Sequence, residues 1–240
     1  MSHERHAMTA LRRQETLRQA ASFTTVCGHQ RAQRGQKISA IKLAAFDVDG
    51  TILRGENICG CIARKLGRTV EMDGFELLRS RDEIAAGRET MLEWYAPFDR
   101  AALIGHLSEL RLAPGVKEGF ARLKEAGVKI ALVSITWEFA VGWFASELGA
   151  DYAVGTGWQE KGTIDHFWPE DKASYLSSLI AELSIDRDAV AAAGDSHGDI
   201  PMLNLASRSY FVGEHLPSEL SHAKHLHNAN IEEIVSDMLA

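Results

Sequence analysis

The sequence predicts an α/β protein: a doubly wound parallel sheet with an inserted helical cap domain. Three observations predict it. Short apolar runs typical of buried strands recur along the chain, helical periodicity separates them, and one long segment looks helical throughout. Strands that alternate with helices favour parallel pairing through right-handed crossovers. The 240 residues are enough for such a core and a smaller inserted domain.

Five short apolar runs are the predicted strands. They comprise residues 41–46, 128–133, 152–154, 189–193 and 210–212. The first run stops at Asp47, the second at Ser134 and the fourth at Gly194. Polar groups therefore follow the strands directly, which is the place where open α/β sheets bind their ligands.

Helical patterns fill the intervals between these strands. Residues 116–123 carry one apolar face, and Gly127 is expected to end that helix. Residues 176–183 have apolar positions at i, i+3, i+4 and i+7. Residues 137–148 predict a third helix, which stops at Gly149.

The segment 54–111 interrupts this alternation. It shows no clear strand pattern, is punctuated by single glycines and ends before Pro114. We therefore predict a core of residues 38–53 and 112–240, with residues 54–111 as a helical cap that is entered just after the first strand.

Residues 1–37 form a basic leader. They hold seven Lys and Arg against two Asp and Glu, a net charge of +5, whereas the whole chain has a net charge of −7. Residues 38–240 therefore carry −12, which argues against nucleic acid as a partner of the core. We expect the leader to be a poorly ordered tail, with a targeting segment, a nucleic-acid tail or a start-site artefact as alternatives.

Composition indicates a cytoplasmic protein without a membrane partner. No apolar run approaches the roughly 20 residues that span a bilayer, and no apolar block after the early arginines resembles a secretory signal. The three cysteines, Cys27, Cys59 and Cys61, are too few and too uneven for a disulfide framework, which indicates a reducing compartment. Nothing in the sequence indicates the oligomeric state.

Two carboxylates stand directly after the first predicted strand. Asp47 and Asp49 lie in the string Asp47-Val48-Asp49-Gly50-Thr51. Their repulsion at the end of an apolar strand is costly unless a cation or another partner offsets it. One can be a nucleophile while the other is an acid and base. A simple turn at the strand end is the structural alternative.

Three further polar clusters lie after predicted strands or at a helix start. The hydroxyl of Ser134 can hold a phosphate oxygen, and Lys172 is a point charge suited to phosphate. Asp195 and Asp199, in a loop with glycines, suit a hard cation that prefers oxygen ligands. Taken singly, the serine and the lysine also have ordinary structural explanations.

Together these clusters resemble the four motifs of the haloacid dehalogenase superfamily, in particular of its phosphatase branch. The matching positions are, in order, Asp47 to Thr51, Ser134, Lys172, and Gly194-Asp195 with Asp199. The resemblance covers residues 38–240 and rests on four motifs in the right order. It implies a Rossmann-like core and a phosphatase that acts on a small phosphate monoester.

The resemblance also implies a mechanism. Asp47 would become an aspartyl-phosphate, and Asp49 would protonate the leaving oxygen and then activate water. Mg²⁺ would be held by Asp47, the backbone carbonyl of Asp49 and Asp195. Ser134 and Lys172 would neutralise the transferring phosphoryl group.

Two further residues have supporting roles in this resemblance. Thr51 would position the loop after the first strand. Asp199 would orient the lysine of the third motif or support the water shell of the metal.

The helical insertion resembles the cap of the phosphoserine-phosphatase-like subgroup. Glu56, seven residues after Asp49, occupies the position of a glutamate that meets the substrate amine, so phosphoserine or another amino-phosphate is a candidate substrate. The chain departs from the subgroup at Ile135 and Thr136, where two glycines are typical, and at Gly198, where asparagine is typical.

The substrate-carboxylate arginine of that subgroup has three candidates, Arg79, Arg81 and Arg88. Two other functions stay open. A phosphotransferase or mutase of the same fold would need a second acceptor in place of water. A non-catalytic member that binds a ligand or partner would be expected to lack at least one catalytic residue, and none is missing.

Overall fold

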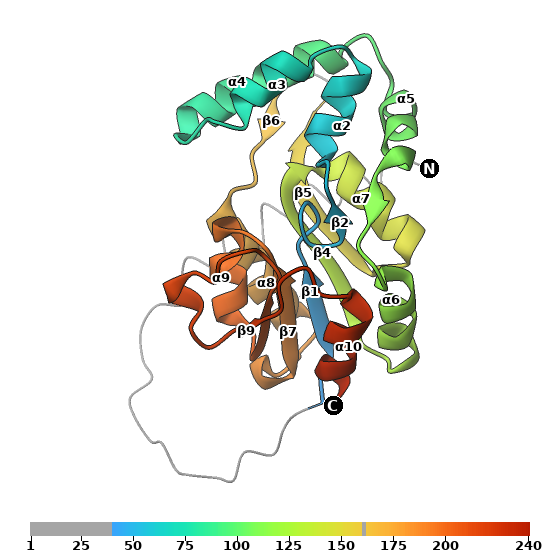
Figure 1. Cartoon of the computed structure of the whole chain (residues 1–240), viewed down its shortest axis with the longest axis vertical. Helices are drawn as coiled ribbons and strands as arrows, with labels where there is room; N and C mark the ends of the chain where they lie inside the picture. The colour runs from blue at the N-terminus through green and yellow to red at the C-terminus, as the bar shows by residue number, and fades with distance from the viewer. Residues whose placement is uncertain (1–39, 160–161) are drawn as a thin grey trace.

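The computed structural model describes residues 40–159 and 162–240. The predicted leader, residues 1–37, lies outside the described residues. In the described part, a sheet is flanked by helices on two sides, and a further group of helices stands at one end of it (Figure 1). None of the helices in these two ranges combines the length and apolar character needed to cross a membrane.

The central sheet confirms the predicted fold class. Its strands are β1 (Leu43–Phe46), β4 (Lys129–Trp137), β5 (Tyr152–Trp158), β6 (Ile164–Asp165), β7 (Val190–Gly194), β8 (Arg208–Phe211) and β9 (Lys224–His225). Among the described residues they are ordered β6-β5-β4-β1-β7-β8-β9. The pairs from β5 to β9 are parallel, and β6 adds one antiparallel edge strand.

The strand β1 lies at the centre of this sheet and all four of its residues are 0% exposed. It pairs with β4 on one side and with β7 on the other. Because the carboxyl ends of parallel strands meet at one edge of a sheet, the residues that follow β1 and β7 are brought side by side.

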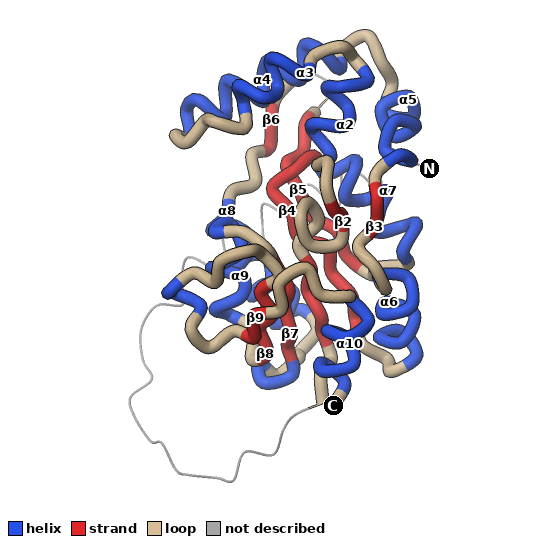
Figure 2. Tube along the Cα trace, viewed as in Figure 1, coloured by secondary structure: helices blue, strands red, loops and turns tan. Residues whose placement is uncertain are grey.

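Helices cover both faces of the sheet (Figure 2). One layer consists of α6 (Val116–Glu125), α7 (Glu138–Leu148) and α10 (Ile231–Leu239), and the other of α8 (Pro169–Glu182) and α9 (Ile200–Leu205). Phe46 of β1 meets Phe120 of α6 at 4.9 Å between ring centroids, whereas Leu43 belongs to the cluster that contains Leu176 of α8. Burial of both faces explains why the strands read as unbroken apolar runs.

A second group of elements lies between β1 and α6. It comprises β2 (Leu53–Arg54), α2 (Ile58–Lys65), α3 (Thr69–Phe75), α4 (Arg81–Tyr95), α5 (Arg100–Gly105), the 3₁₀ helix η1 (His106–Glu109) and β3 (Arg111–Leu112). β2 and β3 pair antiparallel. The two borders of the segment that was predicted to be helical throughout are therefore short strands. The sequence did not reveal them, because a strand of two residues is too short to show an alternation of apolar and polar residues.

Three short 3₁₀ helices complete the described elements: η2 (Arg187–Ala189), η3 (His197–Asp199) and η4 (Ser218–Leu220). The three helices expected near residues 116–123, 137–148 and 176–183 are confirmed as α6, α7 and α8. The last begins at Pro169, which confirms the helix start expected at Lys172.

The strand β4 corrects one expectation. Ser134 was predicted to end this strand, but the strand continues to Trp137, with a register irregularity between Val133 and Trp137. The added residues Ile135, Thr136 and Trp137 are β-branched or aromatic and favour a strand. Ser134 is therefore held within the sheet rather than in a loop.

Candidate active site

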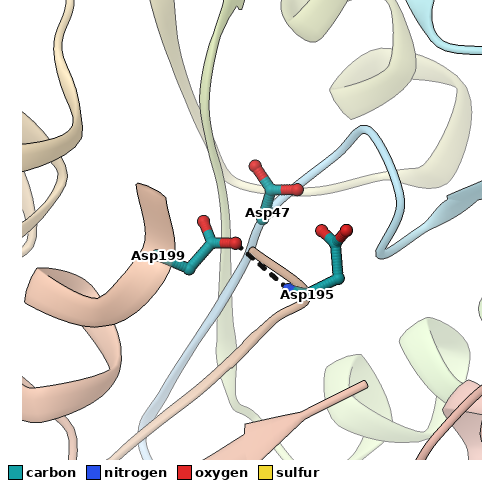
Figure 3. Close-up of side chains that lie close together, drawn as sticks. All are labelled: Asp47, Asp195 and Asp199. Atoms are coloured by element: carbon teal, nitrogen blue, oxygen red, sulfur yellow. Dashed lines mark hydrogen bonds between the residues drawn. The ribbon is translucent and has the colours of Figure 1, made fainter. Parts of the chain in front are cut away.

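Three carboxylates converge at the carboxyl edge of the sheet (Figure 3). Asp47 follows β1, Asp195 follows β7, and Asp199 ends η3; one oxygen of each lies within 4.8 Å of the others. Asp47 and Asp199 are buried, and Asp195 is partly buried. Carboxylates this close together repel one another strongly unless a cation offsets their charge.

Lys172 supplies one such cation. Its Nζ donates hydrogen bonds to Oδ1 of Asp47 at 2.6 Å and to Oδ1 of Asp199 at 2.5 Å. Burial by itself lowers the pKa of Lys172, but the carboxylates of Asp199 and Asp47 outweigh burial and raise it above its ordinary value. The ammonium therefore stays charged at neutral pH.

Both oxygens of Asp199 are committed to protein donors. Oδ2 accepts hydrogen bonds from the backbone N–H of Asp195 at 3.1 Å (Figure 3) and from the N–H and hydroxyl of Ser196, each at 3.0 Å. Oδ1 accepts from Lys172. A β-carbon at Gly194 would lie 2.5 Å from Asp199 Cβ, so the approach requires glycine there. This carboxylate thus orders the loop after β7 and orients the lysine.

Asp47 and Asp195 keep more of their oxygens available. Burial raises the pKa of Asp47, the Asp199 charge adds to this effect, and Lys172 opposes it. Burial likewise raises the pKa of Asp195, against a hydrogen bond from the Thr51 hydroxyl at 3.0 Å. One ammonium does not balance this all-oxygen set, whose chemistry suits a hard divalent cation.

The carboxylate of Asp49 lies apart from this cluster. The backbone N–H of Ile58, the first residue of α2, donates to Asp49 Oδ1 at 2.9 Å. Burial raises the pKa of Asp49 to about 6, against the lowering effects of that hydrogen bond and of Lys172. A carboxyl group with this pKa can exchange a proton near neutral pH, as acid–base catalysis requires.

A cavity of about 340 Å³ opens onto these groups. Its lining includes Asp47, Asp49, Ser134 and Lys172 from the sheet side. Other lining residues come from the helical segment: Cys59, Met72, Phe75, Ile84, Arg88 and Met91. The volume matches a small-molecule site rather than a macromolecular surface.

Of the three candidate arginines, Arg88 is the one that lines the cavity. Its side chain is buried, and Nη2 donates to the carbonyl oxygens of Ile135 at 3.0 Å and Phe167 at 3.3 Å. Burial lowers the pKa of Arg88 to about 10, which still leaves it charged at neutral pH. Arg79 and Arg81 are exposed and stand outside the lining.

Glu56 lies away from the cavity lining. Its carboxylate accepts two hydrogen bonds from the guanidinium of Arg64, at 2.8 Å each. Glu76, which the sequence patterns did not single out, does line the cavity and accepts a hydrogen bond from Asn57 at 2.8 Å. No local motif marks Glu76, because its place depends on how α3 folds over the sheet.

A family model for haloacid dehalogenase-like hydrolases matches residues 44–204, and the chain belongs to this family. Two relatives are phosphoserine phosphatases. The one from Polaromonas sp. (strain JS666 / ATCC BAA-500) is 29% identical over 188 residues, which cover 72% of this chain and 79% of the relative. The one from Albidiferax ferrireducens is 29% identical over 217 residues, which cover 82% and 86%.

Solved structures agree on the fold. A HAD family hydrolase from Salmonella enterica serovar Typhi has a TM-score of 0.73 at 22% identity, over 84% of this chain and 72% of that one. A phospho-aspartyl intermediate analogue of a phosphoserine phosphatase has a TM-score of 0.68 at 19% identity, over 84% and 100%. The family and its curated relatives confirm the prediction of a phosphatase. Phosphatases of this family generally use a divalent metal ion.

Proposed function

We propose that this chain is a Mg²⁺-dependent phosphatase that hydrolyses a small phosphate monoester through an aspartyl-phosphate on Asp47. The observation that carries the proposal is the position of the buried Asp47. Its carboxylate is bound to Lys172 and faces a cavity of about 340 Å³, with Asp49 on the same wall. A nucleophile, an acid–base group and a phosphate-binding cation therefore share one small pocket.

In the first step, a carboxylate oxygen of Asp47 attacks phosphorus. The new O–P bond forms as the bond from phosphorus to the ester oxygen breaks, and Asp49 gives its proton to that leaving oxygen, which departs as the alcohol. Lys172 and the hydroxyl of Ser134 hold the phosphoryl oxygens as their charge redistributes.

In the second step, water releases the phosphate. Asp49, now a carboxylate, takes a proton from a water molecule as the water oxygen attacks phosphorus. The bond between phosphorus and the carboxylate oxygen of Asp47 breaks. The products are inorganic phosphate, the free Asp47 carboxylate and Asp49 in its protonated form. The pKa of about 6 for Asp49 supports this double role, because both protonation states are accessible near neutral pH.

We assign the magnesium site to Asp47, the backbone carbonyl of Asp49 and Asp195. Bound there, the ion neutralises charge on the phosphoryl oxygens. Asp199 is excluded from this set because its oxygens are already used by Lys172 and the loop after β7. Thr51 orients Asp195 through its hydroxyl.

The substrate is proposed to be phosphoserine or another phosphorylated amino compound. Two observations support this choice: the relatives are phosphoserine phosphatases, and the Arg88 guanidinium in the cavity offers a partner for a substrate carboxylate. We further propose that residues 54–111 act as the cap over the site. The free thiols of Cys59 and Cys61 support a cytoplasmic location.

The test is phosphate release from O-phospho-L-serine and from p-nitrophenyl phosphate. Asp47→Asn should abolish it, because an amide cannot form the acyl-phosphate, whereas Asp73→Asn, an exposed aspartate of α3, should not. EDTA should silence the enzyme, Mg²⁺ should restore it, and Ca²⁺ should substitute poorly. Near wild-type release by Asp47→Asn would refute the mechanism. Interconversion of a sugar phosphate without phosphate release would indicate a mutase instead.

A further inference from the structure

Thr156 is a buried threonine that joins the two segments carrying Ser134 and Lys172. It belongs to β5, is 1% exposed and lies outside the cavity lining. Its Oγ1 donates to the carbonyl oxygen of Ile135 at 2.9 Å and accepts from the N–H of Phe167 at 3.2 Å. The carbonyl oxygen of Phe167 lies 3.4 Å away as a second, longer acceptor. One side chain of β5 therefore contacts both the residue after Ser134 and the segment before α8.

The first contact falls where β4 departs from regular pairing. Between Val133 and Trp137, three residues of β4 face the single residue Gly155 of β5. A β-carbon at Gly155 would lie 2.6 Å from the carbonyl oxygen of Thr136, so the two backbones can approach this closely only with glycine at position 155. The approach brings the Thr156 hydroxyl to the irregular stretch of β4. Irregularities of this kind re-aim side chains out of the regular pleat.

Ser134 is the first residue of this irregular stretch, and its side chain lines the cavity. Its hydroxyl oxygen accepts a hydrogen bond from the N–H of Thr136 at 3.4 Å, so its own hydrogen can be donated to a phosphoryl oxygen. The carbonyl group of Ile135, which accepts from Thr156, lies between these two residues in the chain. The Thr156 hydroxyl therefore fixes the backbone that directs the Ser134 hydroxyl.

The second contact falls at the start of the helix that carries Lys172. Trp168, the residue before α8, donates its N–H to Oδ2 of Asp171 at 2.8 Å and so closes the first turn of the helix. Phe167 directly precedes this turn, and Lys172 directly follows Asp171. A shift of Phe167 would therefore move the first turn of α8, and with it the Nζ that binds Asp47.

We propose that Thr156 is a positioning residue that sets the relative placement of the Ser134 hydroxyl and the Lys172 ammonium. The inference rests on the proposed function, in which these two groups hold the phosphoryl oxygens. Thr156 lies outside the cavity lining and acts through the backbone of Ile135 and Phe167. Because every phosphate monoester presents the same phosphoryl group, Thr156 should affect all substrates alike rather than the choice among them.

Four variants test this role. Thr156→Val replaces the hydroxyl by a methyl group of similar volume, and Arg88 still donates to the carbonyl oxygens of Ile135 and Phe167, so the fold should survive. Thr156→Ala is a second deletion of the hydroxyl, should the valine variant fail to fold. Thr156→Ser keeps the hydroxyl. Ser209→Ala is the matched control, because it removes a buried hydroxyl of β8 that donates to a carbonyl of α9, outside the cavity lining.

The kinetic arm measures kcat/KM for O-phospho-L-serine and for p-nitrophenyl phosphate, beside the melting temperature of each variant. Thr156→Val and Thr156→Ala should lower kcat/KM about tenfold for both esters, since a misplacement of about 1 Å can cost about 100-fold. Thr156→Ser should keep the wild-type values, and so should Ser209→Ala, even where its melting temperature falls as far. Wild-type kinetics in both deletions, an equal loss in Ser209→Ala, or a loss confined to one ester would overturn the inference.

The binding arm needs no turnover. Calorimetry measures Kd for inorganic phosphate in the presence of Mg²⁺, and Kd should rise about tenfold in Thr156→Val and return to the wild-type value in Thr156→Ser. An unchanged Kd in Thr156→Val would overturn the inference. If the wild-type chain hydrolysed neither ester but phosphate binding changed as stated, the proposed function alone would fail. Hydrolysis by the wild-type chain, with unchanged kinetics and Kd in Thr156→Val, would sink the inference alone.

Discussion

The hydroxyl oxygen of Thr51 lies 3.0 Å from a carboxylate oxygen of Asp195. This contact joins the loop after β1 to the loop after β7, two segments separated by 144 positions in the sequence. Thr51 is 0% exposed, so water cannot easily replace its hydroxyl as the donor. The threonine therefore fixes the direction of one of the carboxylates that we assign to the metal.

Thr51→Val should weaken the response to Mg²⁺ because Asp195 loses the donor that orients it. Groups that orient metal ligands typically contribute about 10–100-fold in metal affinity or activity. Titration of phosphate release with Mg²⁺, together with calorimetric Mg²⁺ binding, measures the effect. Thr51→Ser keeps the hydroxyl and is the control. An unchanged Mg²⁺ titration in the valine variant would contradict this role.

Asp49→Asn should slow turnover of O-phospho-L-serine about 10²–10⁴-fold, the usual contribution of a general acid or base. With p-nitrophenyl phosphate the leaving group needs little protonation, so Asp47 should still be phosphorylated, but water attack should be slow. Intact-protein mass spectrometry should therefore detect a species heavier by one phosphoryl group. Its absence, with rapid phosphate release, would remove Asp49 from the mechanism.

Arg81 should help to hold α4 against the start of α8. Its guanidinium binds the Glu170 carboxylate and lies 5.1 Å from the centroid of the Trp168 ring. An exposed ion pair and a cation–π contact contribute about 0.2–1 kcal/mol each, so Arg81→Ala should raise KM a few-fold at most and leave kcat nearly unchanged.

Limited proteolysis should also cut the helical segment of Arg81→Ala faster than that of wild type. Arg79→Ala is the matched control, because the Arg79 side chain binds only backbone carbonyls of its own turn among the described residues. Identical proteolysis and kinetics in Arg81→Ala and Arg79→Ala would show that the contact of Arg81 does not hold α4 against the start of α8.

Asp237 should make stability depend on pH. Lys224 donates to its Oδ1 at 2.6 Å and the Tyr210 hydroxyl to its Oδ2 at 2.8 Å. The Lys224 hydrogen bond, opposed by partial burial, holds the pKa of Asp237 below its ordinary value. A carboxyl whose pKa is lowered by folding stabilises the fold above the unfolded pKa of about 3.9, and the benefit disappears as pH falls through the folded pKa.

Asp237→Asn should therefore lower the free energy of unfolding by about 0.2–1 kcal/mol at pH 7, the range for an exposed pair. The difference from wild type should shrink towards zero as the pH falls below about 3. Urea unfolding at both pH values measures it, with Asp188→Asn, an exposed aspartate without an ion pair in the described residues, as control. A difference that is constant with pH would argue against the pairing.

The order of the core elements and the placement of Asp47, Lys172 and Asp195 could be predicted because each depends on a local pattern. An apolar run followed by a polar turn marks a strand end wherever it occurs. Glu56 and Glu76 could not be told apart in this way. Spacing along the chain places a backbone, but the direction of a side chain depends on which neighbour, here Arg64 or Asn57, packs against it.

The extension of β4 escaped prediction for a related reason. Ser134 resembles a residue at a strand end, and the pairing of β4 with β5 is interrupted after Val133 and resumes only at Trp137, opposite Thr156. The cavity itself combines residues from the sheet with residues of α2, α3 and α4. A sequence pattern within one segment does not predict how these segments pack against one another, so the cavity could not be predicted.

Gly50 has a φ of +85°, and a β-carbon at this position would lie 2.2 Å from Asp195 Oδ2. Which residues are tolerated at position 50 therefore depends on the residue at position 195. While an aspartate stands at 195, a larger residue at 50 would have to adopt a strained left-handed backbone and push the Asp195 carboxylate aside. Related chains that keep an aspartate at 195 are therefore expected to keep glycine at position 50.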